Sequence, residues 1–218
     1  MTISHVPRRL VLSAGLVVLL AGCTGVATSP SGSVATPSTS ASATAPSSAA
    51  ATGSAPTGLV CTAPASPTLA VTEGPYYKAG APESTDLVQP GMAGTRLTLT
   101  GYVMTTACAP VANAKVEIWQ ADASGAYDNN GYTLRGYVLT DGQGRFTIQT
   151  VVPGEYPGRT EHIHVKVTPP GGTTLTTQLF FPGTTANDDD AIYDPSLLLA
   201  ISEQGSGLVG TFTFVVPA

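Results

Sequence analysis

Two histidines separated by one residue are the strongest chemical signal in the sequence. His162 and His164 stand in His-Ile-His-Val-Lys-Val, an alternating segment typical of a β-strand. Because side chains two positions apart in a strand point to the same face, both imidazoles should project together while Ile163 and Val165 face the core. Two converging imidazoles supply half of a metal site. The pair alone leaves a second interpretation open, a pair of solvated surface histidines.

Two tyrosines in nearby motifs could complete such a site. Tyr156 lies six residues before His162, in Pro-Gly-Glu-Tyr-Pro, and Tyr127 ends the segment Trp-Gln-Ala-Asp-Ala-Ser-Gly-Ala-Tyr. A phenolate is a hard, strongly donating anion suited to ferric iron, and a bound metal lowers the phenol pKa enough to deprotonate it. Either tyrosine taken alone is more often a packing residue. The hypothesis of a ferric site therefore depends on all four side chains together.

The elements that must position these residues are β-strands. The chain has 24 Gly, 18 Pro and only 6% aromatic residues, which favours many turns and short strands over a helical bundle. We predict an all-β fold, an antiparallel β-sandwich with at most one short helix, near residues 195–202. Alternating segments predict strands at residues 97–103, 115–120, 145–151, 162–167, 177–181 and 211–215. A sandwich alone does not identify a function.

The beginning of the chain has the pattern of a secretory signal. Arg8 and Arg9 precede an apolar run over residues 10–22, which ends at Cys23. The run is shorter than the roughly 20 residues that a membrane-spanning helix needs, which disfavours a permanent transmembrane helix. Its last residues, Leu-Ala-Gly-Cys, resemble the bacterial lipobox, in which the cysteine is acylated and becomes the mature N-terminus. We therefore expect a lipoprotein signal peptide over residues 1–22 and a lipid anchor on Cys23.

A tether should connect this anchor to the folded part of the chain. Residues 24–58 use only Ser, Thr, Ala, Pro and Gly apart from Val26 and Val34, and they carry no charge. Such a segment buries too little apolar surface to offset its conformational entropy. We predict a disordered tether over residues 23–58 and one folded domain over residues 59–218, held at the extracellular face of the plasma membrane or released from it.

The two remaining cysteines belong to an exported domain, where disulfides persist. A bridge between Cys61 and Cys108 would stabilise the fold by about 4 kcal/mol on loop-entropy grounds. The alternative is a pair of buried free thiols. The bridge, which we favour, would fix the N-terminal arm of the domain to the region around Cys108.

The charges of the chain exclude several classes of function. Nine Lys and Arg against 14 Asp and Glu give a net charge of −5, too few cations for the basic patch that binds nucleic acid. A Ser-His-Asp hydrolase is disfavoured because it needs a histidine that is free to act as a base, and His162 and His164 are both committed to the same pair. A nucleotide-binding protein is disfavoured because no glycine motif typical of nucleotide binding opens a helix. The acidic run at 188–190 could bind Ca²⁺, but we predict the commoner outcome, a solvated loop.

Six blocks of sequence, in order along the folded domain, carry a resemblance to a known family. The blocks lie at residues 73–82 (Glu-Gly-Pro-Tyr-Tyr-Lys-Ala-Gly-Ala-Pro), 116–127, 135–146, 153–157, 162–164 and 175–181. Together they resemble the intradiol ring-cleavage dioxygenases, although each block alone would be a weak match. The resemblance implies an oxidoreductase with a non-haem Fe(III) cofactor, which cleaves a catechol between its two hydroxylated carbons with O₂ and gives a muconate-type dicarboxylate.

The resemblance also assigns roles to individual residues. It implies that Tyr127, Tyr156, His162 and His164 are the iron ligands and that Tyr156 leaves the iron when the substrate binds. Arg159 matches an arginine that stabilises charge developing on the substrate ring, and Gln178 matches a glutamine near the site. The alternatives are a surface cation for Arg159 and an ordinary strand residue for Gln178.

The partners implied are a small aromatic catechol, O₂ and, through the lipid anchor only, a membrane; a homodimer is left open. Glu161 adds an anion beside the histidines, which disfavours carboxylated catechols, and the block at 73–82 favours plain catechols. A rival function is a non-catalytic envelope lipoprotein whose sandwich binds an aromatic compound, a metal or a wall component. A degenerate relative of that kind should have lost a ligand, and all four are present here.

Overall fold

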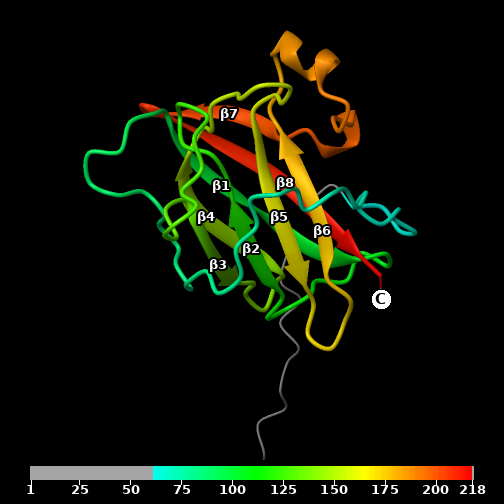
Figure 1. Ribbon diagram of the computed structural model, residues 1–218. Helices are drawn as coiled ribbons and strands as arrows, with labels where there is room; N and C mark the ends of the chain where they lie inside the picture. Colours follow the sequence, from blue (N-terminus) through cyan, green and yellow to red (C-terminus); the bar gives the residue numbers. More distant parts are fainter. Residues whose placement is uncertain (1–60, 218) are drawn as a thin grey trace, which may run out of the picture. The chain divides into compact units, whose positions relative to one another are not determined.

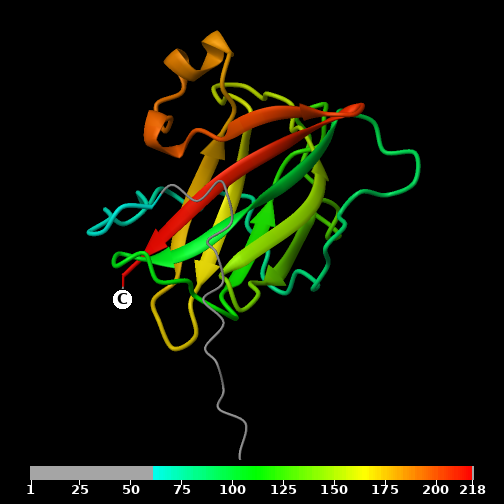
Figure 2. The same cartoon turned by 180° about the vertical axis from the view of Figure 1, so that it is seen from behind.

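The computed structural model describes residues 61–217, which form two facing four-stranded sheets (Figures 1 and 2). The strand orders are β4-β1-β8-β7 and β3-β2-β5-β6. The strands are β1 Arg96–Thr105, β2 Lys115–Trp119, β3 Arg135–Leu139, β4 Arg145–Val151, β5 His162–Thr168, β6 Leu175–Phe180, β7 Ala200–Gln204 and β8 Gly207–Val216. The predicted all-β sandwich is confirmed. The predicted signal peptide, Cys23 and the predicted tether lie outside the described residues.

The hydrophobic core lies between the two sheets and follows from the alternation within the strands. In β1, Leu97, Leu99 and Val103 are completely buried, and they meet Ile163 and Val165 of β5 in one apolar cluster. Each fully buried aliphatic side chain of this size contributes on the order of 2 kcal/mol. This packing fixes which side of β5 faces inward. His162 and His164, which alternate with Ile163 and Val165, must therefore face outward from the core.

Two features of the sheets depart from the sequence prediction. Strand β8 pairs with β1 in parallel, with Leu97 opposite Leu208, whereas the other strand pairs are antiparallel. Alternation of apolar residues is the same in parallel and antiparallel strands, so the sequence pattern could not distinguish them. Strands β3 and β7 were also not predicted.

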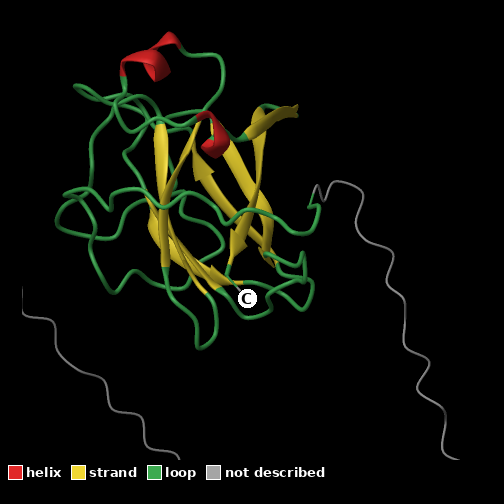
Figure 3. Ribbon diagram, turned by 90° about the vertical axis from the view of Figure 1, so that its right-hand side faces the viewer, coloured by secondary structure: helices red, strands yellow, loops and turns green. Residues whose placement is uncertain are grey.

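The sequence allowed at most one short helix, near residues 195–202, and the structure has no α-helix there. The segment contains only a three-residue 3₁₀ helix, Pro195–Leu197, and then continues as extended chain into β7, which pairs with β8. A second 3₁₀ helix, Thr185–Asp189, was not predicted. Backbone pairing with the edge of β8 satisfies the hydrogen bonds that a longer helix would have made. Both 3₁₀ helices lie at one end of the sandwich (Figure 3).

The N-terminal segment of the domain crosses the outer face of the β3-β2-β5-β6 sheet (Figure 1). A disulfide joins Cys61 to Cys108, with 5.8 Å between the Cα atoms. Further along, the amide of Val71 donates to the carbonyl of Thr176. The bridge and this hydrogen bond direct the segment across β5 and β6, where it covers the histidines. Among residues 61–217, none of the helices has the length and apolar character needed to cross a membrane.

Candidate metal centre

The two histidines of β5 project together on the outer face of their sheet, as their spacing predicts. The Nε2 atoms of His162 and His164 lie 3.2 Å apart, and each residue is at most 2% exposed. The phenol oxygen of Tyr156 lies 3.3 Å from the Nε2 atom of His162. The phenol oxygen of Tyr156 and the Nε2 atom of His164 therefore both lie within hydrogen-bonding distance of the Nε2 atom of His162.

The fourth predicted ligand, Tyr127, reaches the same place from the loop after β2. Its ring centroid lies 5.8 Å from that of Tyr156 and 6.2 Å from that of His164. Its phenol oxygen is buried and has no hydrogen-bond partner among the described residues. Leaving a buried hydroxyl unpaired costs about 1–3 kcal/mol, so this oxygen is placed for a partner other than a protein group.

The ring of His162 is fixed in the orientation that a metal ligand needs. Its Nδ1 atom lies 2.6 Å from the backbone carbonyl of Thr160, which can only accept, so Nδ1 carries the proton and Nε2 keeps its lone pair. Burial lowers the pKa of His162 to about 4, assisted by the charge of Arg159. Burial also lowers the pKa of His164 well below its ordinary value. Both imidazoles are therefore neutral, the form that binds a metal.

The two phenols are protonated in the absence of a cation. Burial raises the pKa of Tyr127, and the neighbouring Tyr156 raises it further. Burial raises the pKa of Tyr156 as well, although the charge of Arg159 opposes this shift. A strongly charged cation would reverse both shifts by stabilising the phenolates. Two imidazole nitrogens and two phenol oxygens are a donor set that fits a ferric ion.

The centre is not a cluster of the common acidic or sulfur ligands. Within residues 61–217, no group of three or more His, Cys, Asp or Glu side chains is arranged to hold a metal. The convergent donors are instead two histidines and two tyrosines. A donor set with two phenol oxygens differs from the zinc sites that histidine-rich motifs usually form.

The loops that carry the two tyrosines are held in close contact. The carboxylate of Asp122 accepts the amides of Ser124 and Ala126, which closes a tight turn just before Tyr127. Gly125 within this turn has φ +83°, and a Cβ atom there would lie 2.2 Å from the carbonyl oxygen of Glu155. Only glycine permits this close approach, which places Tyr127 beside the loop of Tyr156.

Arg159 and Gln178 both lie at the centre, as the resemblance implied. The guanidinium of Arg159 donates to the phenol oxygen of Tyr156 at 3.4 Å and to the side-chain oxygen of Gln178 at 2.5 Å. Gln178, completely buried on β6, uses its amide nitrogen to donate to the carbonyl of Thr72. Gln178 thus links Arg159 to the N-terminal segment that covers the site.

The prediction that the acidic run forms a solvated loop was wrong for Asp190. This residue is 5% exposed and its carboxylate accepts hydrogen bonds from Arg159 Nε at 2.9 Å and from the amide of Thr160 at 3.0 Å. Burial raises the pKa of Asp190, but hydrogen bonds from the amide of Ile192, from Arg159 and from the amide of Thr160, together with the charge of Arg159, keep that pKa below its ordinary value. Asp188 and Asp189 are exposed. The sequence alone could not show that Asp190 is the buried residue of the three.

Residues of the N-terminal segment were missed as parts of the site. The ring of Tyr76 stacks on Tyr127 with 4.4 Å between centroids, and a Cβ atom on Gly74 would lie 3.2 Å from the ring of His164. Arg135 is buried beneath them, where it donates to the carbonyl of Tyr76. The Gly-Pro-Tyr-Tyr motif, which is part of the family resemblance, was the sequence signal that could have identified this segment as part of the site.

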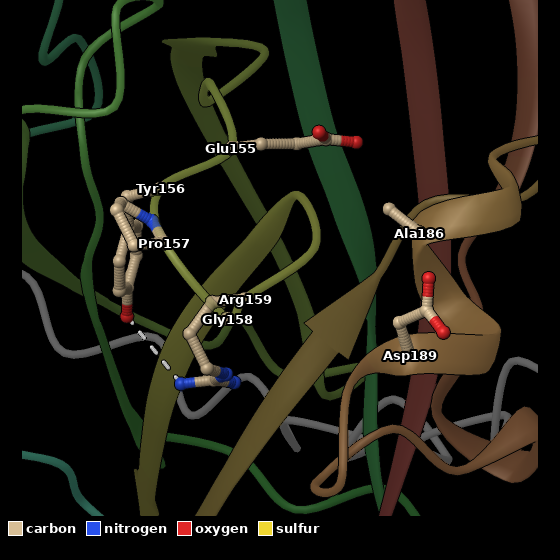
Figure 4. A pocket seen from close by; sticks show the side chains of 7 residues that line it. All are labelled: Glu155, Tyr156, Pro157, Gly158, Arg159, Ala186 and Asp189. Atoms are coloured by element: carbon tan, nitrogen blue, oxygen red, sulfur yellow. Dashed lines mark hydrogen bonds between the residues drawn. The ribbon is translucent and has the colours of Figure 1, made fainter.

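A cavity of about 360 Å³ opens beside Tyr156 and Arg159 (Figure 4). The 3₁₀ helix Thr185–Asp189 forms its opposite wall. Its lining residues are Glu155, Tyr156, Pro157, Gly158, Arg159, Ala186 and Asp189. The volume suits a small ligand such as a substituted benzene ring.

The chain is similar to known dioxygenases in sequence and in structure. A family model described as dioxygenase matches residues 72–216. A catechol 1,2-dioxygenase from Pseudomonas sp. (strain EST1001) is 30% identical over 180 residues, covering 66% of this chain and 60% of that protein. The dioxygenase domain of a dioxygenase and carbohydrate-binding protein fusion from Streptomyces sp. SirexAA-E superimposes with a TM-score of 0.68 and 48% identity, covering 70% of this chain and 99% of that one. An intradiol ring-cleavage dioxygenase from Tetranychus urticae has a TM-score of 0.65 at 26% identity, covering 70% and 95%.

The matched range contains the whole centre, from the segment that carries Tyr76 to the end of the sheets, and defines the class as a dioxygenase. The chain belongs to the intradiol ring-cleavage dioxygenase family. It spans about three fifths of the length of the catechol dioxygenase that it matches.

Proposed function

We propose that this protein is a non-haem Fe(III)-dependent intradiol dioxygenase, which cleaves a catechol between its hydroxylated carbons with O₂ and yields a muconate-type dicarboxylate. The observation that carries this proposal is the convergence of two neutral histidine nitrogens with two tyrosine oxygens. Tyr156 Oη lies 3.3 Å from His162 Nε2, which lies 3.2 Å from His164 Nε2, and Tyr127 Oη is buried beside them without a partner.

The ligands in this proposal are Tyr127, Tyr156, His162 and His164. Ferric iron, when bound, would draw electron density from a chelated catechol and make its ring reactive toward dioxygen. Thr160 O orients the ring of His162, and the stacked ring of Tyr76 restricts Tyr127. These contacts organise the donor atoms before the metal arrives, which reduces the cost of binding it.

The two tyrosines have different freedom to move. Tyr127 is the more deeply buried of the two and is stacked on Tyr76. Tyr156 lines the open cavity on a short turn that ends at Arg159. Tyr156 is therefore the ligand suited to move aside for a substrate, and its phenolate oxygen could then accept a substrate phenol proton.

Arg159 is placed to stabilise negative charge on the bound ring. Its guanidinium lies at the cavity wall within 3.4 Å of Tyr156 Oη, and Gln178 and Asp190 hold it there. A fixed positive group beside developing charge lowers the barrier without having to reorganise. Gln178 therefore supports the site indirectly, because it holds Arg159 and also binds the N-terminal segment that covers the site.

We also propose that the protein acts at the outer face of the plasma membrane in the breakdown of aromatic compounds. The support is the sequence alone: the signal pattern over residues 1–22, the lipid-anchor pattern at Cys23 and the uncharged segment that follows. A reaction that needs only O₂ and the aromatic substrate suits a location without nicotinamide cofactors.

The proposal is tested with the purified protein loaded with ferric iron. We expect the visible charge-transfer colour of tyrosinate bound to iron, a change of that colour on anaerobic addition of catechol, and uptake of one O₂ per muconate formed. A protein that retains no iron and consumes no oxygen with catechol, hydroxyquinol or protocatechuate would exclude the dioxygenase activity.

A further inference from the structure

The cavity beside the metal centre is lined by acids at its rim. Of the lining residues, Glu155 and Asp189 carry carboxylates and both are exposed. The Oε1 atom of Glu155 accepts a hydrogen bond from the hydroxyl of Thr184 at 3.3 Å, which holds its side chain across the cavity toward the 3₁₀ helix (Figure 4). The two carboxylates therefore flank the approach to Tyr156 from opposite walls.

Arg159 is the one cation among the described residues that line this cavity, and its charge is already balanced. Its Nε atom pairs with Asp190 at 2.9 Å, and the Asp190 side chain is completely buried. Its two terminal nitrogens donate to Tyr156 and Gln178. Three of its five N–H groups thus have protein acceptors, and its charge is paired with that of Asp190, so the pair presents no net positive charge to a carboxylate on a substrate.

The guanidinium of Arg135 does not change the charge balance of the cavity. Arg135 lies behind the ring of Tyr127, 5.8 Å from its centroid, and is 1% exposed. It donates to the backbone carbonyls of Tyr76 and Asp128 and does not line the cavity. A substituent projecting from the metal toward the cavity mouth would meet Glu155 and Asp189 before it met an unpaired cation.

We infer that this cavity selects catechols whose ring substituents are neutral or positively charged and disfavours catechols that bear a carboxylate. The inference rests on the proposed function and specifies its substrate class. A carboxylate in the cavity would lose hydration, gain no free cation and lie near two like charges. Neutral substituents avoid these costs, and an ammonium group would be attracted.

The sharpest probe is a pair of substrates that differ in charge but not in shape. 3,4-Dihydroxybenzoate and 3,4-dihydroxybenzamide are nearly isosteric, and only the benzoate is an anion at neutral pH. We expect kcat/KM for the amide to exceed that for the acid by about tenfold at low salt, mainly through KM, from like-charge repulsion at the cavity mouth. The ratio should shrink in 0.5 M NaCl because the rim charges are exposed. 4-(2-Aminoethyl)catechol should bind at least as well as the amide.

Variants of the rim test whether these acids cause the discrimination. Glu155→Gln and Asp189→Asn should each lower the amide-to-acid ratio about threefold, and the double variant should lower it further. Glu203→Gln removes the same charge from an exposed site on β7, away from the cavity, and should leave the ratio unchanged.

A binding measurement keeps the test independent of turnover. Anaerobic calorimetry of the iron-loaded and the metal-free protein with 4-hydroxybenzamide and 4-hydroxybenzoate should give the same preference for the amide. Equal affinity or kcat/KM for acid and amide, or a ratio unchanged in the double variant, would overturn the inference while leaving the dioxygenase activity standing. Absence of turnover with every catechol would instead overturn the proposed function, and the binding preference would still decide the inference.

Discussion

The buried carboxylate of Asp190 holds the side chain of Arg159 against the metal centre. The Arg159 Nε atom lies 2.9 Å from Asp190 Oδ2, and the carboxylate also accepts the amides of Thr160 and Ile192. The Asp190 side chain is completely buried, whereas that of Arg159 is 14% exposed. The pair joins the segment after β6 to the turn before β5, so two parts of the chain distant in sequence jointly set the position of the guanidinium.

Replacing Asp190 with alanine should destabilise the protein and impair Arg159. The change leaves a largely buried guanidinium without its counterion and the amide of Thr160 without an acceptor, at a cost of about 3 kcal/mol in unfolding free energy. Urea unfolding measures the loss, and oxygen uptake with catechol should show a lower kcat. Asp188→Ala, at an exposed neighbour, should change stability by less than about 0.5 kcal/mol. Equal effects of the two variants would contradict the role of Asp190.

The sequence could indicate which four side chains come together at the candidate centre, because their spacing and family motifs are local. His162 and His164 are placed by the alternation of a single strand, and Tyr127 and Tyr156 lie in short motifs that resemble those of a known family. Their contact distances could not be predicted, because they depend on how the loops meet. The ion pair between Arg159 and Asp190 could not be predicted either, because it depends on a turn whose position no local sequence pattern defines.

The fold was predicted at the level of its class and not of its connections. The core-facing alternation identified most strands, but β7 was missed because its residues Ala200–Gln204 are largely exposed and carry no strong apolar alternation. The parallel pairing of β1 with β8 brings together the beginning and the end of the domain. Such long-range pairing is decided by packing across the whole sandwich, which a residue pattern does not contain.

Tyr127→Phe should stabilise the metal-free protein while abolishing ferric iron retention. The phenol oxygen is buried without a partner, so its removal relieves a cost of about 1 kcal/mol or more. The same oxygen is a proposed ligand, so the charge-transfer colour should disappear. Urea unfolding with a chelator and visible spectra with iron measure the two effects. Tyr132→Phe alters a half-exposed phenol that donates to the carbonyl of Ala79 and should produce neither effect. Iron retention in Tyr127→Phe would contradict the assignment of this ligand.

The stability of the metal-free protein should fall as the pH falls from about 6.5 to about 4. Burial lowers the folded-state pKa of His162 to about 4, so below about 6.5 the unfolded chain binds a proton that the folded chain does not. This difference is worth on the order of 3 kcal/mol, and it is fully present above pH 6.5. His164 shifts in the same direction. Urea midpoints at pH 7, 6, 5 and 4 measure the slope, which should be shallower in His162→Gln. An equal slope in the variant would contradict this origin.

Gly125→Ala should separate the two tyrosine loops. An alanine there would adopt φ +83° and place its Cβ atom 2.2 Å from the backbone carbonyl of Glu155, which cannot move aside as a flexible side chain would. We expect a loss of about 3 kcal/mol in unfolding free energy, about 1 from the backbone conformation and the rest from displacement of the loop. Gly171→Ala, at φ +69° with no atom within 4 Å, isolates the conformational part and should cost only about 1 kcal/mol. Because the displaced loop carries Tyr156, only Gly125→Ala should also weaken iron retention, measured by the charge-transfer absorbance during dialysis. Similar stability and iron retention in the two variants would show that this close approach does not position the tyrosines.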